Sequence, residues 1–329
     1  MSDSARTEVF LTIDTEIWCE SWSRLEESFP DAFRRYVYGP TSRGNFSIPM
    51  ILDTFQDHGL AATFFVEPLF SFRFGLPALE EIIGLILERH QDIQLHAHTE
   101  WLDEAKPAIL PRVREKTARI CDFSEDEQAK ILQMSIARLH EAGAPRAKAF
   151  RAGSYAFDRN TLRALQKSGI TIDTSYNAAS LAGTADVEPH RLLSQPTRCD
   201  SVYLYPVTTF HDGSRRNIRP LALTAISSKE IEYVLTYAAD HQWKTVVIVL
   251  HNFELLTPDK TRPDPIVVNR FRRLCRFLER NSDRFNVSTF GSTSPSESAS
   301  QPPLPVTSRF QTALRTLEQV QRRILFKGV

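Results

Sequence analysis

The sequence predicts a parallel β/α barrel of about seven strands, and three observations support this fold class. Short apolar segments alternate with helical segments along most of the chain, which is typical of parallel strands buried on both faces. A glycine follows several of the helical segments, at Gly59, Gly143 and Gly169, where helices commonly end. The alternation is unbroken over all the predicted strands, which favours a barrel.

Each predicted element follows from the spacing of its apolar residues. Helical spacing, as at Ile48, Ile51 and Phe55, predicts a helix, and a short continuous apolar run predicts a buried strand. The predicted strands are 9–13, 61–66, 93–96, 147–150, 170–172, 202–207 and 245–250, with a last short one at 285–289. The predicted helices are 48–58, 79–89, 125–142, 158–167, 228–241 and 267–280. These elements would complete one barrel domain over residues 1–290.

Composition excludes several classes of protein. Hydrophobic residues make up 42% of the 329 residues and include 21 Phe, which is enough for a large core and excludes a disordered or collagen-like chain. Forty Lys and Arg balance forty Asp and Glu, so the chain has no net positive charge to attract nucleic acid, and we expect no nucleic-acid partner.

The chain has no sequence signal for a membrane span, for export or for a disulfide framework. Its longest apolar runs, at 82–87 and 246–250, are far shorter than the about 20 residues of a transmembrane helix. The first residues are polar and lack a secretory leader. The four cysteines are far apart and form no CxxC. We therefore expect a cytoplasmic protein with reduced cysteines.

The C-terminal region differs in composition from the barrel. Residues 291–306 read GSTSPSESASQPPLPV and predict a flexible linker. Residues 307–329 predict a basic amphipathic helix. Its apolar residues are Phe310, Leu314, Leu317, Ile324 and Leu325, and its basic residues are Arg309, Arg315, Arg322, Arg323 and Lys327. Such a helix would either dock on the barrel or a partner, or lie peripherally on the anionic inner face of a membrane.

Polar side chains of catalytic types follow four of the predicted strands. Carboxyl ends of parallel strands meet at one rim of a β/α fold, so these clusters should converge. Taken singly, Asp14 can be a helix cap, His96 a core histidine and Arg151 a structural ion pair, but their joint placement favours a functional site. The clusters are Asp14-Thr15-Glu16, His96-Ala97-His98-Thr99-Glu100, Arg151-Ala152-Gly153-Ser154-Tyr155 and His251-Asn252-Phe253-Glu254.

These segments resemble the polysaccharide deacetylases, also called the NodB-homology group, over about residues 9–256. The matching segments, in the family's order, are LTIDTE at 11–16, LAATFFV at 60–66, HAHTE at 96–100, FRAGSY at 150–155, IDTS at 172–175 and LH at 250–251. The resemblance implies a distorted (β/α) barrel, one divalent metal ion and hydrolysis of the acetamide of an amino sugar or glycan precursor.

The metal ligands depart from the commonest family pattern at two positions. Position 15 is Thr where many members carry the metal-binding Asp, and the Asp-x-Glu variant of the family places that carboxylate at Glu16 instead. His96 is the second implied ligand. The second departure is at position 100, which is Glu where the family usually has its second histidine. The third ligand therefore stays open, because Glu100 keeps the spacing from His96 and His98 keeps the imidazole side chain. Zinc accepts either side chain at about 2.0–2.2 Å, and Mn, Co or Ni are further candidates for a carboxylate-containing site.

The chemistry of amide hydrolysis assigns roles to the remaining residues. A divalent ion lowers the pKa of a bound water, and Asp14 would take its proton as general base. The family implies that Arg151 holds Asp14 ionised and that His251 protonates the leaving amine. The backbone N–H of Tyr155 would stabilise the oxyanion. Asp173 and Asp212 are both candidates for orienting His251.

The expected partner is an N-acetylated carbohydrate, lipid- or nucleotide-linked because a cytoplasmic enzyme would act on a precursor. Trp18 and Trp101 flank the polar motifs and would stack on a sugar, with packing inside the loops as the alternative. Asp173 is a further candidate substrate-binding residue. Three other functions stay open: an amidohydrolase barrel, suggested by the His-x-His at 96–98, a deformylase or other amidase of the same fold, and an inactive carbohydrate-binding pseudo-deacetylase.

Overall fold

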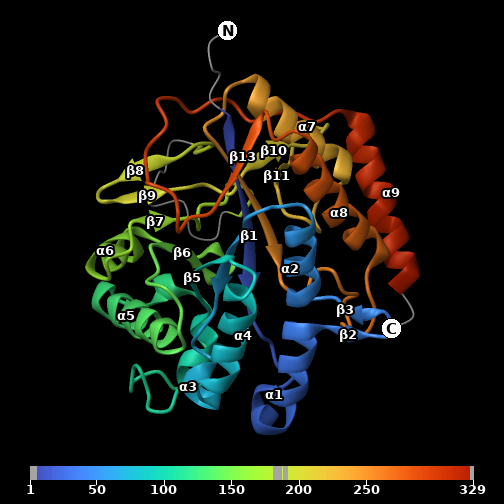
Figure 1. Ribbon diagram of the computed structural model, residues 1–329. Coiled ribbons are helices and arrows are strands. Elements are labelled where there is room, and N and C mark those ends of the chain that lie inside the picture. The colour runs from blue at the N-terminus through green and yellow to red at the C-terminus, as the bar shows by residue number, and fades with distance from the viewer. Residues whose placement is uncertain (1–5, 181–186, 188–191, 327–329) are drawn as a thin grey trace.

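A curled, mostly parallel β-sheet forms the centre of the protein, with helices around its outer side (Figure 1). The structure is a computed structural model that describes residues 6–180, 187 and 192–326. Its strands are β1 (Thr7–Thr15), β4 (Thr63–Val66), β5 (Asp92–Ala97), β6 (Ala149–Ala152), β7 (Ile172–Asp173), β8 (Thr197–Cys199), β9 (Val202–Leu204), β12 (Thr245–His251) and β13 (Phe285–Ser288).

The order of the strands confirms the predicted barrel and shows how it is distorted. Strands β12, β1, β4, β5, β6, β7 and β9 follow one another and are all parallel, and β8 joins β9 antiparallel. β13 pairs with the first half of β1 and β4 with the second half. β9 does not pair with β12. Irregular chain after β9 covers that edge instead, where the N–H of Thr208 donates to Val247 O at 3.1 Å and the N–H of Leu223 to Val249 O at 3.0 Å.

The predicted helices are present within a few residues of their expected ends. They are α2 (Ile48–Asp57), α4 (Pro77–Leu87), α5 (Glu125–Glu141), α6 (Arg159–Lys167), α7 (Ser228–Asp240), α8 (Pro265–Arg280) and α9 (Arg309–Phe326). Capping boxes begin three of them, at Ser124, Asp158 and Ser227, because each side chain accepts a bond from the N–H three residues later.

Several short elements lie outside the predicted strands and helices. α1 (Leu25–Phe33) buries Leu25, Phe29 and Ala32 on one face, and Pro30 within it obscured the helical signal. The other helical elements are α3 (Ser71–Phe74), a π-helical turn (Arg34–Tyr38) and 3₁₀ turns at Trp22–Arg24, Thr99–Glu104, Ile120–Asp122 and Gly153–Tyr155. Two hairpins pair β2 (Pro40–Thr41) with β3 (Gly44–Asn45) and β10 (Thr209–His211) with β11 (Ile218–Pro220).

The alternation of side chains along β1 delivers polar groups to the barrel interior. Val9, Leu11 and Ile13 join the large core between sheet and helices. Phe10 faces the opposite way and belongs to a smaller buried cluster with Phe65, Tyr205 and Phe290 among its members. Side chains two residues apart share a face of a strand, so Thr12 and Asp14 point to the same side of β1 as Phe10. They lie beyond the Phe10 cluster, nearer the carboxyl end of the barrel.

The segment 291–306 is anchored to the barrel, so the predicted flexible linker is wrong. The side chain of Gln301 accepts from the N–H groups of Ser194 and Gln195 at 2.8 and 2.9 Å and donates to Gln195 O at 2.9 Å. Leu304 is buried, and Val306 forms a parallel bridge with His211. The Ser/Pro composition does prevent regular structure here, but backbone and amide hydrogen bonds hold the segment in place.

The predicted C-terminal helix is α9, and it docks on the barrel through ion pairs to α7, the turn after β10 and the residue that precedes α8. No helix of the described residues is long and apolar enough to span a bilayer.

Candidate metal centre and active site

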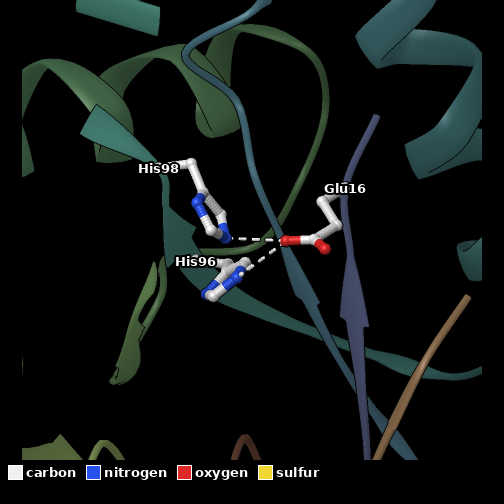
Figure 2. Close-up of side chains that lie close together, drawn as sticks. All are labelled: Glu16, His96 and His98. Atoms are coloured by element: carbon white, nitrogen blue, oxygen red, sulfur yellow. Dashed lines mark ion pairs between the residues drawn. The ribbon is translucent and has the colours of Figure 1, made fainter. Parts of the chain in front are cut away.

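Three side chains from the carboxyl ends of β1 and β5, the strands on either side of β4, converge into a candidate metal site. Glu16 directly follows β1, His96 lies in β5, and His98 directly follows β5. Their ligand atoms all lie within 4.8 Å of one another, and all three residues are buried. Figure 2 shows one Glu16 carboxylate oxygen facing the edges of both rings. This oxygen is 2.7 Å from His98 Nε2 and 3.5 Å from His96 Nε2.

Nδ1 of each imidazole contacts an acceptor outside the Glu16-His96-His98 cluster, which leaves Nε2 of both rings facing Glu16. His96 Nδ1 lies 2.7 Å from Arg151 O, and His98 Nδ1 lies 3.2 Å from Glu100 Oε2. Such outer contacts set the tautomer and ring orientation of metal-binding histidines. Glu100 therefore lies behind His98, outside the Glu16-His96-His98 cluster, and the structure favours His98 over Glu100 as the third ligand.

The donor set fits a divalent cation. Glu16 Oε2 is buried and accepts no well-aligned hydrogen bond despite its closeness to the two rings. Burial disfavours the ionised form of Glu16, yet the imidazoles of His98 and His96 hold its pKa well below the usual range. An ionised carboxylate with two imidazole Nε2 atoms is a common three-ligand set of catalytic zinc sites.

Beside this cluster, Asp14 forms a buried ion pair with Arg151. Arg151 Nη1 donates to Asp14 Oδ1 at 2.6 Å and to Thr12 Oγ1 at 2.9 Å. The remaining guanidinium nitrogens donate to the hydroxyl and carbonyl of Thr174, and the group lies over the Phe65 ring at 4.5 Å. Arg151 is fully buried, so its charge is compensated by Asp14 and it holds that carboxylate in one orientation.

His251 lies on the other side of Asp14 and is oriented by Glu254. His251 Nε2 is 4.0 Å from Asp14 Oδ2, and His251 Nδ1 is 2.9 Å from Glu254 Oε1. Burial alone would lower the pKa of His251, but the Glu254 carboxylate and the other nearby acids raise it to about 9. The imidazole is therefore protonated at neutral pH and can serve as a proton donor.

The expectation that Asp173 or Asp212 orients His251 is wrong. Asp173 accepts the N–H and hydroxyl of Ser175, and Asp212 bonds Ser214 and Asn217 in its own turn. Glu254 stands three residues after His251, and this short spacing was the available signal for it.

Glu67, which directly follows β4, is a further acid that the sequence analysis missed. Burial raises its pKa to about 8, and its carboxylate accepts the N–H of Leu69 at 2.7 Å.

Two of the three predicted substrate-binding residues are buried away from the surface, so these two predictions are wrong. Trp101 is 1% exposed because it packs against Trp22 and Phe70, and Asp173 is 0% exposed because it caps its own loop. Trp18 differs, since it is partly exposed and its ring meets His98 edge-on at 4.7 Å.

A cavity of about 430 Å³ opens next to Trp18, between the loop that follows β1 and residues 258–260. Its wall includes Trp18, Arg24, Tyr36 and Lys260. The wall residue Trp18 contacts His98, and the wall residue Tyr36 is connected to His251 through ring contacts with Phe253. The cavity is therefore next to the Glu16-His96-His98 cluster on one side and one ring away from His251 on the other, which makes it the candidate substrate site.

The turn after β6 is strained and packs closely against His98. Ser154 and Tyr155 both have a φ of +54°, a conformation that costs energy for residues other than glycine. Burial raises the pKa of the Tyr155 phenol above its usual range, and the nearby Asp14 carboxylate adds to this effect. Tyr155 therefore stays protonated beside Asp14.

Gly153→Ala should disturb His98. An added Cβ would lie 2.8 Å from both His98 Nδ1 and Ala97 O, so the ring must move. We expect a loss of about 1–3 kcal/mol in the free energy of unfolding and roughly 10–100-fold weaker metal binding, measured by denaturation and metal titration. Gly84→Ala in α4 is the control, because its Cβ meets nothing within 4 Å. Unchanged metal affinity in Gly153→Ala would contradict this packing argument.

Comparison with known proteins supports the fold. No protein-family model and no curated protein sequence matches the chain. Among solved structures, a protein from Mycobacterium smegmatis provisionally named a polysaccharide deacetylase superposes with a TM-score of 0.56 at 17% identity, covering 92% of this chain and 97% of that one. The fold is that of a polysaccharide deacetylase.

The deacetylase fold is not tied to one reaction. A 4-alpha-glucanotransferase from Thermococcus litoralis superposes with a TM-score of 0.54 at 12% identity, over 98% of this chain and 47% of that one. A family 4 carbohydrate esterase from Streptomyces lividans reaches a TM-score of only 0.44 at 12% identity, over 92% of this chain and all of its own, too low to support an argument. A shared fold does not establish a shared reaction, so the reaction has to be argued from the side chains of the site.

Proposed function

We propose that the protein is a metal-dependent hydrolase that removes an N-acetyl group from an amino sugar or a glycan precursor. One observation carries the proposal. The Glu16-His96-His98 cluster, the Asp14–Arg151 pair and the His251–Glu254 pair lie together at the carboxyl ends of β1, β5, β6 and β12. Amide hydrolysis needs an activated water, a base and an acid, and these three groups can supply them.

In this proposal Glu16, His96 and His98 hold one divalent ion, with zinc as the first candidate. When bound, such an ion lowers the pKa of a water ligand and polarises the carbonyl of the substrate. Glu100 fixes the orientation of His98, and the carbonyl of Arg151 fixes that of His96. These outer contacts keep the two rings in place for the cation.

Asp14 is the proposed general base. Its Oδ1 is occupied by Arg151, which leaves Oδ2 on the side of His251 to accept a proton from the attacking water. The hydrogen bond from Arg151 prevents rotation of the carboxylate. The N–H of Tyr155 remains our candidate donor to the oxyanion.

His251 is the proposed general acid. Glu254 keeps its imidazole protonated, and Nε2 faces Asp14 across the site. His251 can therefore donate a proton to the leaving nitrogen, and Asp14 can accept one from the attacking water. The two groups thus act on different reactants.

The proposed substrate lies in the cavity beside Trp18 and Tyr36, whose rings can stack on a pyranose face. Acetate release from N-acetylated chito-oligosaccharides by the zinc-loaded protein tests the function. Formate release from an N-formyl amino sugar, with no acetate release, would favour the deformylase alternative. Failure to bind metal or turn over either substrate would favour the pseudo-deacetylase. The cytoplasmic location belongs to the same proposal, and cell fractionation tests it.

Glu254→Gln should move the alkaline limb of the pH profile to lower pH. His251 acts in its protonated form, so activity falls as pH rises through its pKa, which Glu254 helps raise to about 9. Removing the carboxylate charge should shift the midpoint of this limb to lower pH by about 1–3 pH units, measured from the pH dependence of kcat/KM. The control is Glu279→Gln, since Glu279 pairs with the surface-side His58 at 2.8 Å. An unmoved limb in Glu254→Gln would mean that His251 is not the acid.

A further inference from the structure

Helix α9 turns its apolar side away from the protein. Of the large hydrophobic side chains that are exposed among the described residues, four belong to this helix: Phe310 at 72%, Leu317 at 65%, Val320 at 43% and Ile324 at 68%. In Figure 1 the helix lies at the right-hand edge of the molecule, on the outer side of α8. Such a concentration of exposed apolar side chains is typical of an interaction surface.

The opposite side of α9 is fixed to the barrel by charged residues. Arg315 is 3% exposed and pairs with Glu230 Oε1 at 2.7 Å and with Asp212 Oδ2 at 3.5 Å. Arg322 Nε lies 2.7 Å from Asp264 Oδ2, and Glu318 accepts from Arg270 at 2.6 Å. These ion pairs hold the helix in one rotation about its axis, so the apolar side is presented outward permanently.

The exposed apolar residues have the spacing of a helix–helix seam. Phe310, Ala313, Leu317, Val320 and Ile324 are all exposed and follow one another at intervals of three and four residues. This is the a/d pattern of a coiled coil, in which each side chain inserts between four residues of a facing helix. A bilayer does not require so narrow a stripe, since helices that lie on membranes have broad apolar faces.

Charge also favours a second helix over a membrane. Two of the basic residues that were expected to attract an anionic surface, Arg315 and Arg322, point inward and are neutralised by acids. Exposed Thr316 and Gln321 flank the seam and are uncharged. Two copies of this surface would therefore meet without like charges at the centre of their contact.

The two ends of the seam lie at equal distances from its central residue. Leu317 lies at its centre, with Phe310 seven residues before it and Ile324 seven residues after it. In an antiparallel pair with a two-fold axis at Leu317, Leu317 meets its own copy and Phe310 lies near Ile324 of the second copy. A two-fold interface requires such a self-complementary patch.

We propose that two copies of this protein associate through α9 as an antiparallel helix pair. The ion pairs to the barrel order the helix before association, which reduces the entropic cost of binding. The 18 residues of α9 make a short interface, smaller than those of permanent dimers, so we expect a dissociation constant in the roughly micromolar range. The metal centre is not involved, and the proposal is independent of the proposed function.

Sedimentation velocity of the full chain over about 1–200 μM tests the pairing. The sedimentation coefficient of the wild type should rise with concentration from that of a monomer to that of a dimer. Leu317→Glu should weaken association at least tenfold, because two carboxylates would face each other at the axis. Ile324→Glu at the end of the seam should also weaken it. Met134→Glu is the matched control, because Met134 is an exposed apolar residue on α5, and it should associate like the wild type. All the variants should keep the wild-type melting temperature, since they change exposed side chains.

Two outcomes would overturn the proposal. One is a wild type that sediments as one chain at every concentration. The other is a folded Leu317→Glu variant that dimerises as well as the wild type. Anionic phosphatidylglycerol vesicles are the second arm of the experiment. Should the wild type stay monomeric but co-sediment with these vesicles, and Leu317→Glu fail to do so, a membrane is the occupant of the seam and self-association is wrong.

Discussion

Asp14→Asn should retain one bound divalent ion and lose about 10²–10⁴-fold in kcat. Asp14 lies beside the Glu16-His96-His98 cluster and is not one of its members, so the substitution removes the proposed base and leaves the proposed ligands. The amide of Asn can still accept a hydrogen bond from Arg151, but it cannot take a proton from water. Metal content by mass spectrometry and kcat on an N-acetylated oligosaccharide measure the two effects separately.

The control for Asp14→Asn is the same chemical change at the surface, Asp240→Asn, where the carboxylate is 58% exposed and pairs with Arg284. It should alter neither metal content nor kcat. If Asp14→Asn released the metal, Asp14 would be a ligand and the proposed division of roles between Asp14 and Glu16 would be wrong.

His96→Ala and His98→Ala should each abolish stoichiometric metal binding, the other large effect that we expect. Each removes an imidazole whose Nε2 faces Glu16, and a three-ligand site rarely survives the loss of one ligand. A ligand at 100 times its dissociation constant stabilises a protein by about 2.7 kcal/mol. Added zinc should therefore raise the melting temperature of the wild type and leave that of both variants unchanged.

Glu100→Gln separates a ligand from a residue that orients a ligand. Glu100 contacts the outer nitrogen of His98, so we expect the variant to bind one ion with roughly 10–100-fold lower affinity. Metal titration of the purified variant measures this. Complete loss of metal in Glu100→Gln, together with retention in His98→Ala, would reverse the assignment and make Glu100 the third ligand.

Much of this fold could be predicted from local sequence patterns. The apolar runs and helical spacings predicted the strands and helices in their correct order, because a strand buried on both faces and an amphipathic helix each leave a short-range signature. The same reasoning placed Asp14, Glu16, His96 and Arg151 together, since the carboxyl ends of parallel strands always meet at one edge. The contacts of Glu16 with His96 and of Asp14 with Arg151 confirm that these residues lie together.

Choices among neighbouring side chains needed the three-dimensional arrangement. Both His98 and Glu100 have a plausible spacing from His96, and only the direction of each side chain at the end of β5 distinguishes them. Trp101 and Asp173 have the right chemistry for binding a sugar, but packing from other parts of the chain buries both. Local sequence does not indicate that these two side chains are buried, because residues from distant segments of the chain cover them.

The sequence by itself determined that the chain ends in an amphipathic helix, and the tertiary structure alone decided which side of that helix faces the solvent. A hydrophobic pattern ordinarily predicts that the apolar side is buried. In α9 the side that carries Arg315 and Arg322 faces the barrel instead, because Arg315 meets Glu230 across 85 residues of sequence and Arg322 meets Asp264 across 58. The energy of these buried ion pairs depends on contacts between distant residues, and no periodicity within the helix records them.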